Sequence, residues 1–88
     1  MSPDEVGRFR EEIREVDHIL TAALNRRLEL VAELKRYKDA HGLPFVDPER
    51  EAQLIEERLA ENDGPLSDEG LRAFYVELLA LIKRELET

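Results

Sequence analysis

The sequence contains no cysteine, so neither a disulfide framework nor a thiolate metal site is available to it. Glycine and proline are scarce, with four of each among 88 residues, and 39% of the chain is charged. No segment is apolar over membrane-spanning length, and the N-terminal MSPDEVGRFREE lacks the apolar run of a signal peptide. These features favour one helical domain over residues 1–88 that works in the cytoplasm.

Positive charge is also in the minority. Thirteen lysines and arginines stand against 21 aspartates and glutamates, which gives a net charge of −8. Such an acidic chain argues against nucleic acid or an anionic membrane as a partner, and an anionic small molecule would need cations gathered locally. The two histidines, His18 and His41, do not have metal-ligand spacing, so we expect no metal site.

What the sequence does have is helical periodicity. Apolar residues recur three and four positions apart in the first half of the chain: Val6, Phe9, Ile13, Val16, Leu20, Ala23, Leu30, Val31 and Leu34. Ser2-Pro3-Asp4-Glu5 is a capping box, and His41-Gly42-Leu43-Pro44 is a stop signal. The pattern predicts a helix from about residue 3 to 40.

Two shorter helices are predicted after it. Asp47 as N-cap and Pro48 in the first turn begin the second, which ends at Asn62-Asp63-Gly64-Pro65. Ser67 caps the third, and its apolar face consists of Leu71, Phe74, Tyr75, Leu78, Leu79 and Ile82. The predicted fold class is all-α, with one long and two shorter helices per chain.

The long helix is too long for a compact monomer. About 38 residues span about 57 Å, whereas a compact domain of this size has a diameter of roughly 30 Å. Two short helices cannot cover an apolar stripe of that length. We therefore expect a second copy to cover it, in an intertwined helical homodimer.

Two cations interrupt the stripe. Arg27 and Lys38 lie about 20° apart in azimuth and about 16 Å apart along the helix, so they can converge on an anion. Arg10 borders the stripe about 25 Å from Arg27, and reaches the same ligand only from the partner of an antiparallel dimer. The alternative is that all three snorkel or pair with the abundant acids.

The stretch FVDPERE, from Phe45 to Glu51, carries three further candidates, Asp47, Arg50 and Glu51. One interpretation is an ordinary helix start, in which the acids complement the helix dipole. The other is one wall of a binding pocket, because Glu51 lies on the same side of the helix as Ala52 and Ile55.

Arg10 in FREEIREVD, Arg27 in LNRRLELV, Lys38 in KRYKDAHGLP, then VDPERE and GPLSDEGL, together resemble the all-helical chorismate mutases. The resemblance covers about residues 6 to 80, and it rests on the order and spacing of these motifs. It implies an intertwined dimer of three-helix subunits. It also implies the rearrangement of chorismate to prephenate in phenylalanine and tyrosine biosynthesis, without a cofactor.

The resemblance further implies a role for each candidate. Arg27, and Arg10 from the partner subunit, would bind the substrate carboxylates, and Lys38 would donate to the ether oxygen and a carboxylate. Asp47 and Glu51 would meet the ring hydroxyl. Arg50 would support a carboxylate or order the acids. Lys38, Arg27 and Glu51 are the predicted catalytic residues.

One departure from the family pattern lies in the last helix, which usually carries a small polar residue and, four positions on, a glutamine that lines the site. A gapless alignment of GPLSDEGL puts Ile82 and Leu86 there, and neither donates a hydrogen bond. Shifted alignments offer Glu87 or Glu85, which donate only when protonated. A shikimate-pathway enzyme as partner would be one way to complete the site.

Three other interpretations remain open. The first is a related isochorismate pyruvate lyase, against which the intact Asp47 and Glu51 argue. The second is a binding module that senses chorismate or prephenate without converting it, which the apolar Ile82 and Leu86 favour. The third is a structural helical dimer whose charges are merely solvated.

Overall fold

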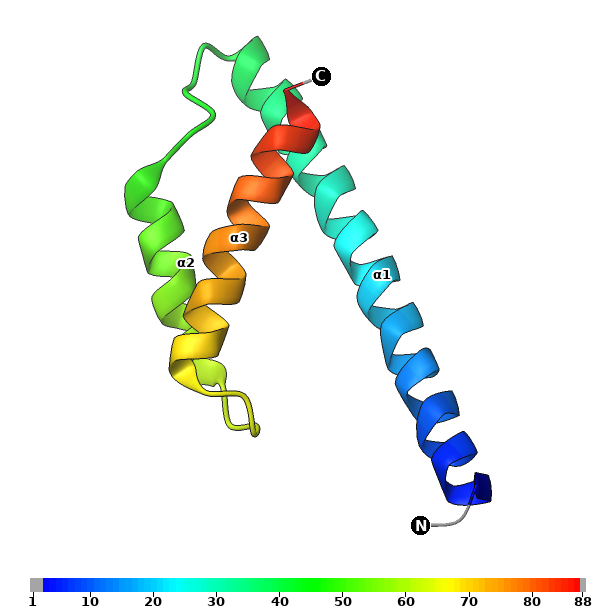
Figure 1. Ribbon diagram of the computed structural model, residues 1–88. Coiled ribbons are helices and arrows are strands. Elements are labelled where there is room, and N and C mark those ends of the chain that lie inside the picture. The colour runs from blue at the N-terminus through cyan, green and yellow to red at the C-terminus, as the bar shows by residue number, and fades with distance from the viewer. Residues whose placement is uncertain (1–2, 88) are drawn as a thin grey trace. The chain divides into compact units, whose positions relative to one another are not determined.

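The computed structural model describes residues 3–87 and consists of three helices, α1 (Pro3–Ala40), α2 (Pro48–Glu61) and α3 (Asp68–Leu86) (Figure 1). Within residues 3–87 no strand is formed, so the predicted all-α class with one long and two shorter helices is confirmed. Ser2, the predicted first N-cap, lies outside the described residues.

The helix boundaries follow the local signals in the sequence. Gly42 adopts a left-handed conformation (φ 67°), and the Leu43 N–H donates to the Lys38 carbonyl at 2.8 Å. Together with a bond from the Gly42 N–H to the Asp39 carbonyl, this is a Schellman motif, which satisfies carbonyls at the end of α1. At the start of α3 the Ser67 hydroxyl accepts a hydrogen bond from the Gly70 N–H at 3.0 Å.

The chain divides into two units, Met1–Glu33 and Leu34–Thr88. The first unit is a stretch of α1 in which none of the residues 4–33 is buried. Its exposed large apolar side chains are Phe9, Ile13, Val16, Ile19, Leu20, Leu24 and Leu30. It thus has no core of its own, and the predicted single domain and homodimer stay predictions.

Intrahelical ion pairs along this first unit add little stability. Arg8 pairs with Glu12, Arg14 with Glu11, and Arg26 with Glu29 at 3.2 Å. All six side chains are exposed, and such pairs stabilise a helix by about 0.2–0.5 kcal/mol each. Their main consequence is that these acids and cations are mutually neutralised.

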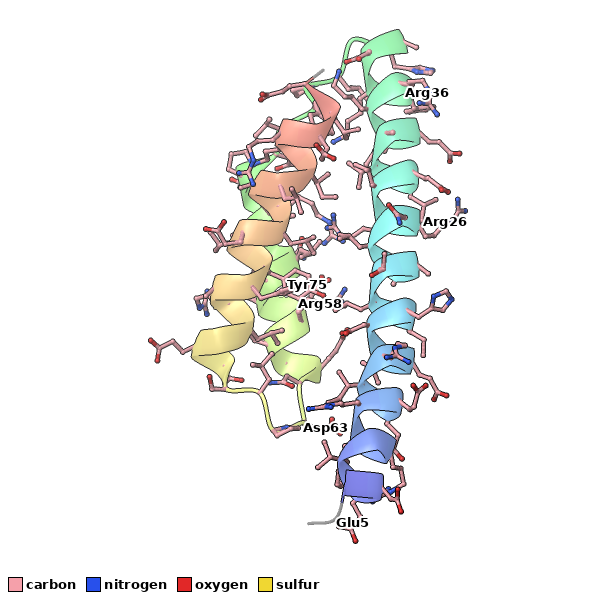
Figure 2. The ribbon with its side chains drawn as sticks, turned by 45° about the vertical axis from the view of Figure 1, so that its right-hand side comes forward. Glu5, Arg26, Arg36, Arg58, Asp63 and Tyr75 are labelled. Carbon is pink, nitrogen blue, oxygen red and sulfur yellow. The ribbon has the colours of Figure 1, made fainter. Side chains whose placement is uncertain are left out.

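The second unit is built around an antiparallel pair of helices, α2 and α3, which lie side by side (Figure 1). Its core consists of Ile55 from α2 and Leu78 and Ile82 from α3. Asp63 lies in the connecting turn (Figure 2), where the Asn62 side chain donates to the Leu66 carbonyl at 2.8 Å. Among residues 3–87 no helix is apolar enough over sufficient length to cross a membrane.

Candidate functional site

Lys38 is positioned by the end of α1. Its carbonyl accepts the Schellman hydrogen bond from Leu43, and its ammonium Nζ donates to the Phe45 carbonyl at 3.4 Å. The side chain is half-buried, and within residues 34–87 no carboxylate forms an ion pair with it. Because an ammonium has three donors, two of them are left for a ligand.

Asp47 is the N-cap of α2, as predicted. Its Oδ1 accepts a hydrogen bond from the Arg50 N–H at 3.1 Å, and its carbonyl accepts one from the Glu51 N–H at 3.0 Å. The helix-start interpretation of FVDPERE is therefore confirmed for this residue. Its predicted contact with the substrate hydroxyl stays a prediction.

Arg50 follows the outer side of α2. Its guanidinium donates to Gln53 at 3.3 Å and to Glu57 at 3.4 Å, and its side chain is 56% exposed. Both partners lie further along α2, so the structure brings Arg50 to Glu57 and not to Glu51. Its predicted support of a carboxylate or of the acids stays a prediction.

Glu51 is brought to α3 by the antiparallel arrangement of the two helices. It lies one turn before the buried Ile55, and its Oε1 is 2.6 Å from Nζ of Lys83. Only 33% of the Lys83 side chain and 29% of the Glu51 side chain are exposed. A partly buried charge pair at this distance is held more strongly than the exposed pairs elsewhere on the chain.

An open pocket of about 440 Å³ lies beside this ion pair. Its apolar lining comes from Val76, Leu79 and Ala80, and its charged lining from Glu51, Lys83, Arg84 and Glu87. All lining residues of α3 recur at helical spacing, so they form one face of that helix. The volume is in the range of small-molecule sites, which run from about 300 to 1,000 Å³.

The structure places the predicted Ile82 and Leu86 off this pocket. Ile82 is 4% exposed and belongs to the α2–α3 core, and Leu86 is half-buried without lining the pocket. Lys83 and Glu87, one position further along, line it instead. The alignment shifted by one residue, which offers Glu87, therefore agrees better with the packing than the gapless one does.

Lys83 and Arg84 are the pocket residues that the sequence reasoning missed. A signal for Lys83 was present, because a hairpin turning near Gly64 puts the start of α2 opposite the end of α3. Lys83 is a basic residue at that end, opposite the acidic Glu51. The shifted alternatives were weighed for hydrogen-bond donors alone, so the cationic neighbours were not considered.

Arg10 and Arg27 belong to the first unit. Arg10 is exposed and Arg27 is half-buried, and neither forms an ion pair within residues 3–33. The neighbouring cations Arg8, Arg14 and Arg26 do find acids there. The alternative in which Arg10 and Arg27 are simply neutralised by local acids is therefore not what the first unit contains.

Among residues 3–87 no cluster of histidine, cysteine or acidic side chains has the grouping of a metal site. The fold and these residues define the chain as a small all-helical protein with a pocket lined by cations. Residues 9–87 match the sequence model of the family described as chorismate mutase type II. The chain therefore belongs to the chorismate mutase type II family, as its motifs led us to expect.

Solved structures and curated relatives agree with this assignment. The chain is similar to two crystal forms of a chorismate mutase from Thermus thermophilus. Form I has a TM-score of 0.86 and 32% identity over 89% of this chain and 98% of the other. Form II has a TM-score of 0.89 and 31% identity over 94% of each chain.

Two kinds of curated relative are similar in sequence. A 4-amino-4-deoxychorismate mutase from Streptomyces venezuelae is 33% identical over 94% of this chain and 78% of its own length. T-proteins from Enterobacter agglomerans and Haemophilus influenzae are 44% and 36% identical over 65% and 82% of this chain. The chain spans only 15% and 20% of the lengths of these two T-proteins.

Proposed function

We propose that the protein converts chorismate to prephenate by a pericyclic rearrangement in phenylalanine and tyrosine biosynthesis. The observation that carries the proposal, beside family membership, is that the three predicted ligand-binding cations have no local acid partner. Arg10 and Arg27 form no ion pair within residues 3–33, and Lys38 forms none within residues 34–87. In a chain of net charge −8, cations kept free of acids are available to a dicarboxylate substrate.

The reaction requires no nucleophile and no net transfer of protons or electrons, since one C–O bond breaks while one C–C bond forms. The protein therefore contributes by holding the flexible substrate in its reactive shape and by stabilising negative charge on the breaking ether bond. We assign carboxylate binding to Arg27 and Arg10, and donation to the ether oxygen to Lys38. Glu51 is assigned to the ring hydroxyl.

The proposal includes a homodimer in which Arg10 enters the partner's site. It is supported by the seven exposed large apolar side chains of α1 that precede Glu33. Burying seven half-exposed side chains contributes on the order of 10 kcal/mol, which offsets much of the cost of association. The proposal also places the protein in the cytoplasm, where a shikimate-pathway enzyme is a predicted partner.

The test of the activity is the loss of chorismate absorbance with purified protein, with the products separated. We expect prephenate, and we expect Arg27→Ala to lower kcat/KM by about a hundredfold or more, because a charged donor to the substrate is lost. Arg26→Ala is the matched control, since Arg26 is exposed and pairs with Glu29 (Figure 2). It should change kcat/KM less than about twofold.

Release of pyruvate instead of prephenate would support the lyase interpretation. Tight chorismate binding without conversion would support the sensor interpretation. Equal losses in Arg26→Ala and Arg27→Ala would contradict the role of Arg27. Unchanged turnover on adding the first enzyme of the shikimate pathway would contradict the partner prediction.

The shared site is tested by mixing two inactive variants, Arg10→Ala and Arg27→Ala, through unfolding and refolding. A hybrid dimer contains one site with both arginines and one with neither. Random pairing of the two chains should restore about a quarter of the wild-type activity. Recovery of no activity, with hybrids verified by mass, would show that both arginines act within one chain or that Arg10 is not needed.

A further inference from the structure

The Glu51–Lys83 ion pair is the feature of the pocket that the proposed function does not yet use. It links the first turn of α2 to the last turns of α3 at 2.6 Å, and both side chains are about two-thirds buried. Both residues also line the pocket of about 440 Å³. A ligand in this pocket therefore meets a glutamate that already has a cation beside it.

The remaining charges do not change this balance. Arg84 and Glu87 complete the charged lining, so the pocket contains two cations and two acids. Within residues 34–87 the Lys83 ammonium pairs with Glu51 and not with Glu87. Glu51 is thus neutralised within the second unit, without any group from the ligand.

Neutralisation has opposite consequences for two ring substituents. A hydroxyl is neutral, so it can donate to a glutamate oxygen while Lys83 stays in place. An amino group is cationic when protonated, so it gains from Glu51 only by displacing Lys83. Displacement leaves two ammonium groups near each other in a partly desolvated pocket, and like charges repel strongly there.

We propose that Lys83 is a specificity-determining residue, which pairs with Glu51 and so makes the pocket select a hydroxyl over an amino substituent on the substrate ring. This inference rests on the proposed function, in which Glu51 meets the ring hydroxyl. The relevant competitor is 4-amino-4-deoxychorismate, the compound in the name of the Streptomyces venezuelae relative, in which an amino group replaces the 4-hydroxyl of chorismate.

The experiment compares kcat/KM for chorismate and for 4-amino-4-deoxychorismate in wild type and in Lys83→Met. Methionine keeps an unbranched side chain of similar length and removes the charge. The wild type should prefer chorismate, and Lys83→Met should shift the ratio toward the amino compound by about tenfold or more. Lys83→Arg retains a cation opposite Glu51 and should keep the wild-type ratio.

Lys35→Met is the matched control, because Lys35 pairs with Asp39 on α1 and does not line the pocket. It should leave the ratio within about twofold. A ratio in Lys83→Met that moves less than twofold would overturn the inference, as would an equal shift in Lys35→Met. Circular dichroism of each variant verifies that the helices are intact.

Calorimetric affinities for the two compounds separate this inference from the proposed function. If the wild type does not make prephenate, the proposed function fails, and the affinity ratio still decides the role of Lys83. If the wild type makes prephenate but neither ratio responds to Lys83→Met, only the specificity inference fails. A Lys83→Met protein that gains neither affinity nor turnover for the amino compound also overturns it.

Discussion

Replacing Ile82 with alanine tests whether this residue belongs to the core or to the substrate pocket. The family alignment without gaps assigns it to the site, whereas its side chain is 4% exposed and packs in the α2–α3 core. The two positions predict different phenotypes. A core residue affects mainly stability, and a pocket residue affects mainly KM or kcat.

The magnitude follows from the buried groups. Ile82→Ala removes three carbon groups at about 0.8 kcal/mol each, or about 2.4 kcal/mol, before any cost of the cavity that is left. Substitutions of this kind cost about 2–5 kcal/mol, and we expect about 3 kcal/mol here because the core of this unit is small. That is a large part of the roughly 5–15 kcal/mol that stabilises most domains.

The assay is urea unfolding followed by far-ultraviolet circular dichroism, at one subunit concentration, because the stability of a dimer depends on concentration. Ile82→Val should cost about 1 kcal/mol, which gives a graded series. Val76→Ala is the control, since Val76 lines the pocket and is 52% exposed. We expect it to cost less than about 1 kcal/mol. A cost below about 1 kcal/mol for Ile82→Ala, with a large rise in KM, would refute the core assignment.

Two further predictions concern the helix ends around the pocket. Asp47→Ala should lower stability by about 1 kcal/mol in the same urea assay because the α2 cap is lost, whereas Asp47→Asn should keep the cap. If Asp47→Asn nevertheless lowers kcat/KM, the carboxylate acts on the substrate as well; equal stability losses would contradict the capping role. Gly42→Ala should cost about 1 kcal/mol or more from backbone strain alone, since a Cβ there meets nothing within 4 Å. Gly42→Asn should cost less, and a neutral Gly42→Ala would contradict the strain argument.

Helix boundaries could be predicted because each depends on a few neighbouring residues. The glycine that ends α1, the aspartate that caps α2 and the serine that caps α3 lie in local hydrogen-bonded motifs whose partners are three to five positions apart. Such interactions are encoded in short stretches and change little with the rest of the fold. The apolar periodicity predicted the helices between them for the same reason.

The pocket residues of α3 were harder to predict because a shift of one residue rotates a side chain by about 100° around its helix. Ile82 and Lys83 are neighbours in the sequence, yet the first packs against α2 and the second pairs with Glu51. An alignment that matches apolar residues alone does not distinguish these two positions. Burial and charge pairing across the α2–α3 hairpin do.

The roles of Arg10 and Arg27 are the least predictable part, for a physical reason. A helix without a core, such as the residues of α1 before Glu33, acquires its environment from what packs against it. The exposed apolar stripe requires such a partner, and the two arginines beside it lack local acids. A cation next to an apolar interface is costly unless an anion completes it on assembly. If the substrate supplies that anion, ligand binding should strengthen the dimer, and dilution in sedimentation experiments should dissociate the liganded protein at lower subunit concentrations than the free protein. Dissociation at the same concentration with and without ligand would contradict this coupling between the site and the subunit interface.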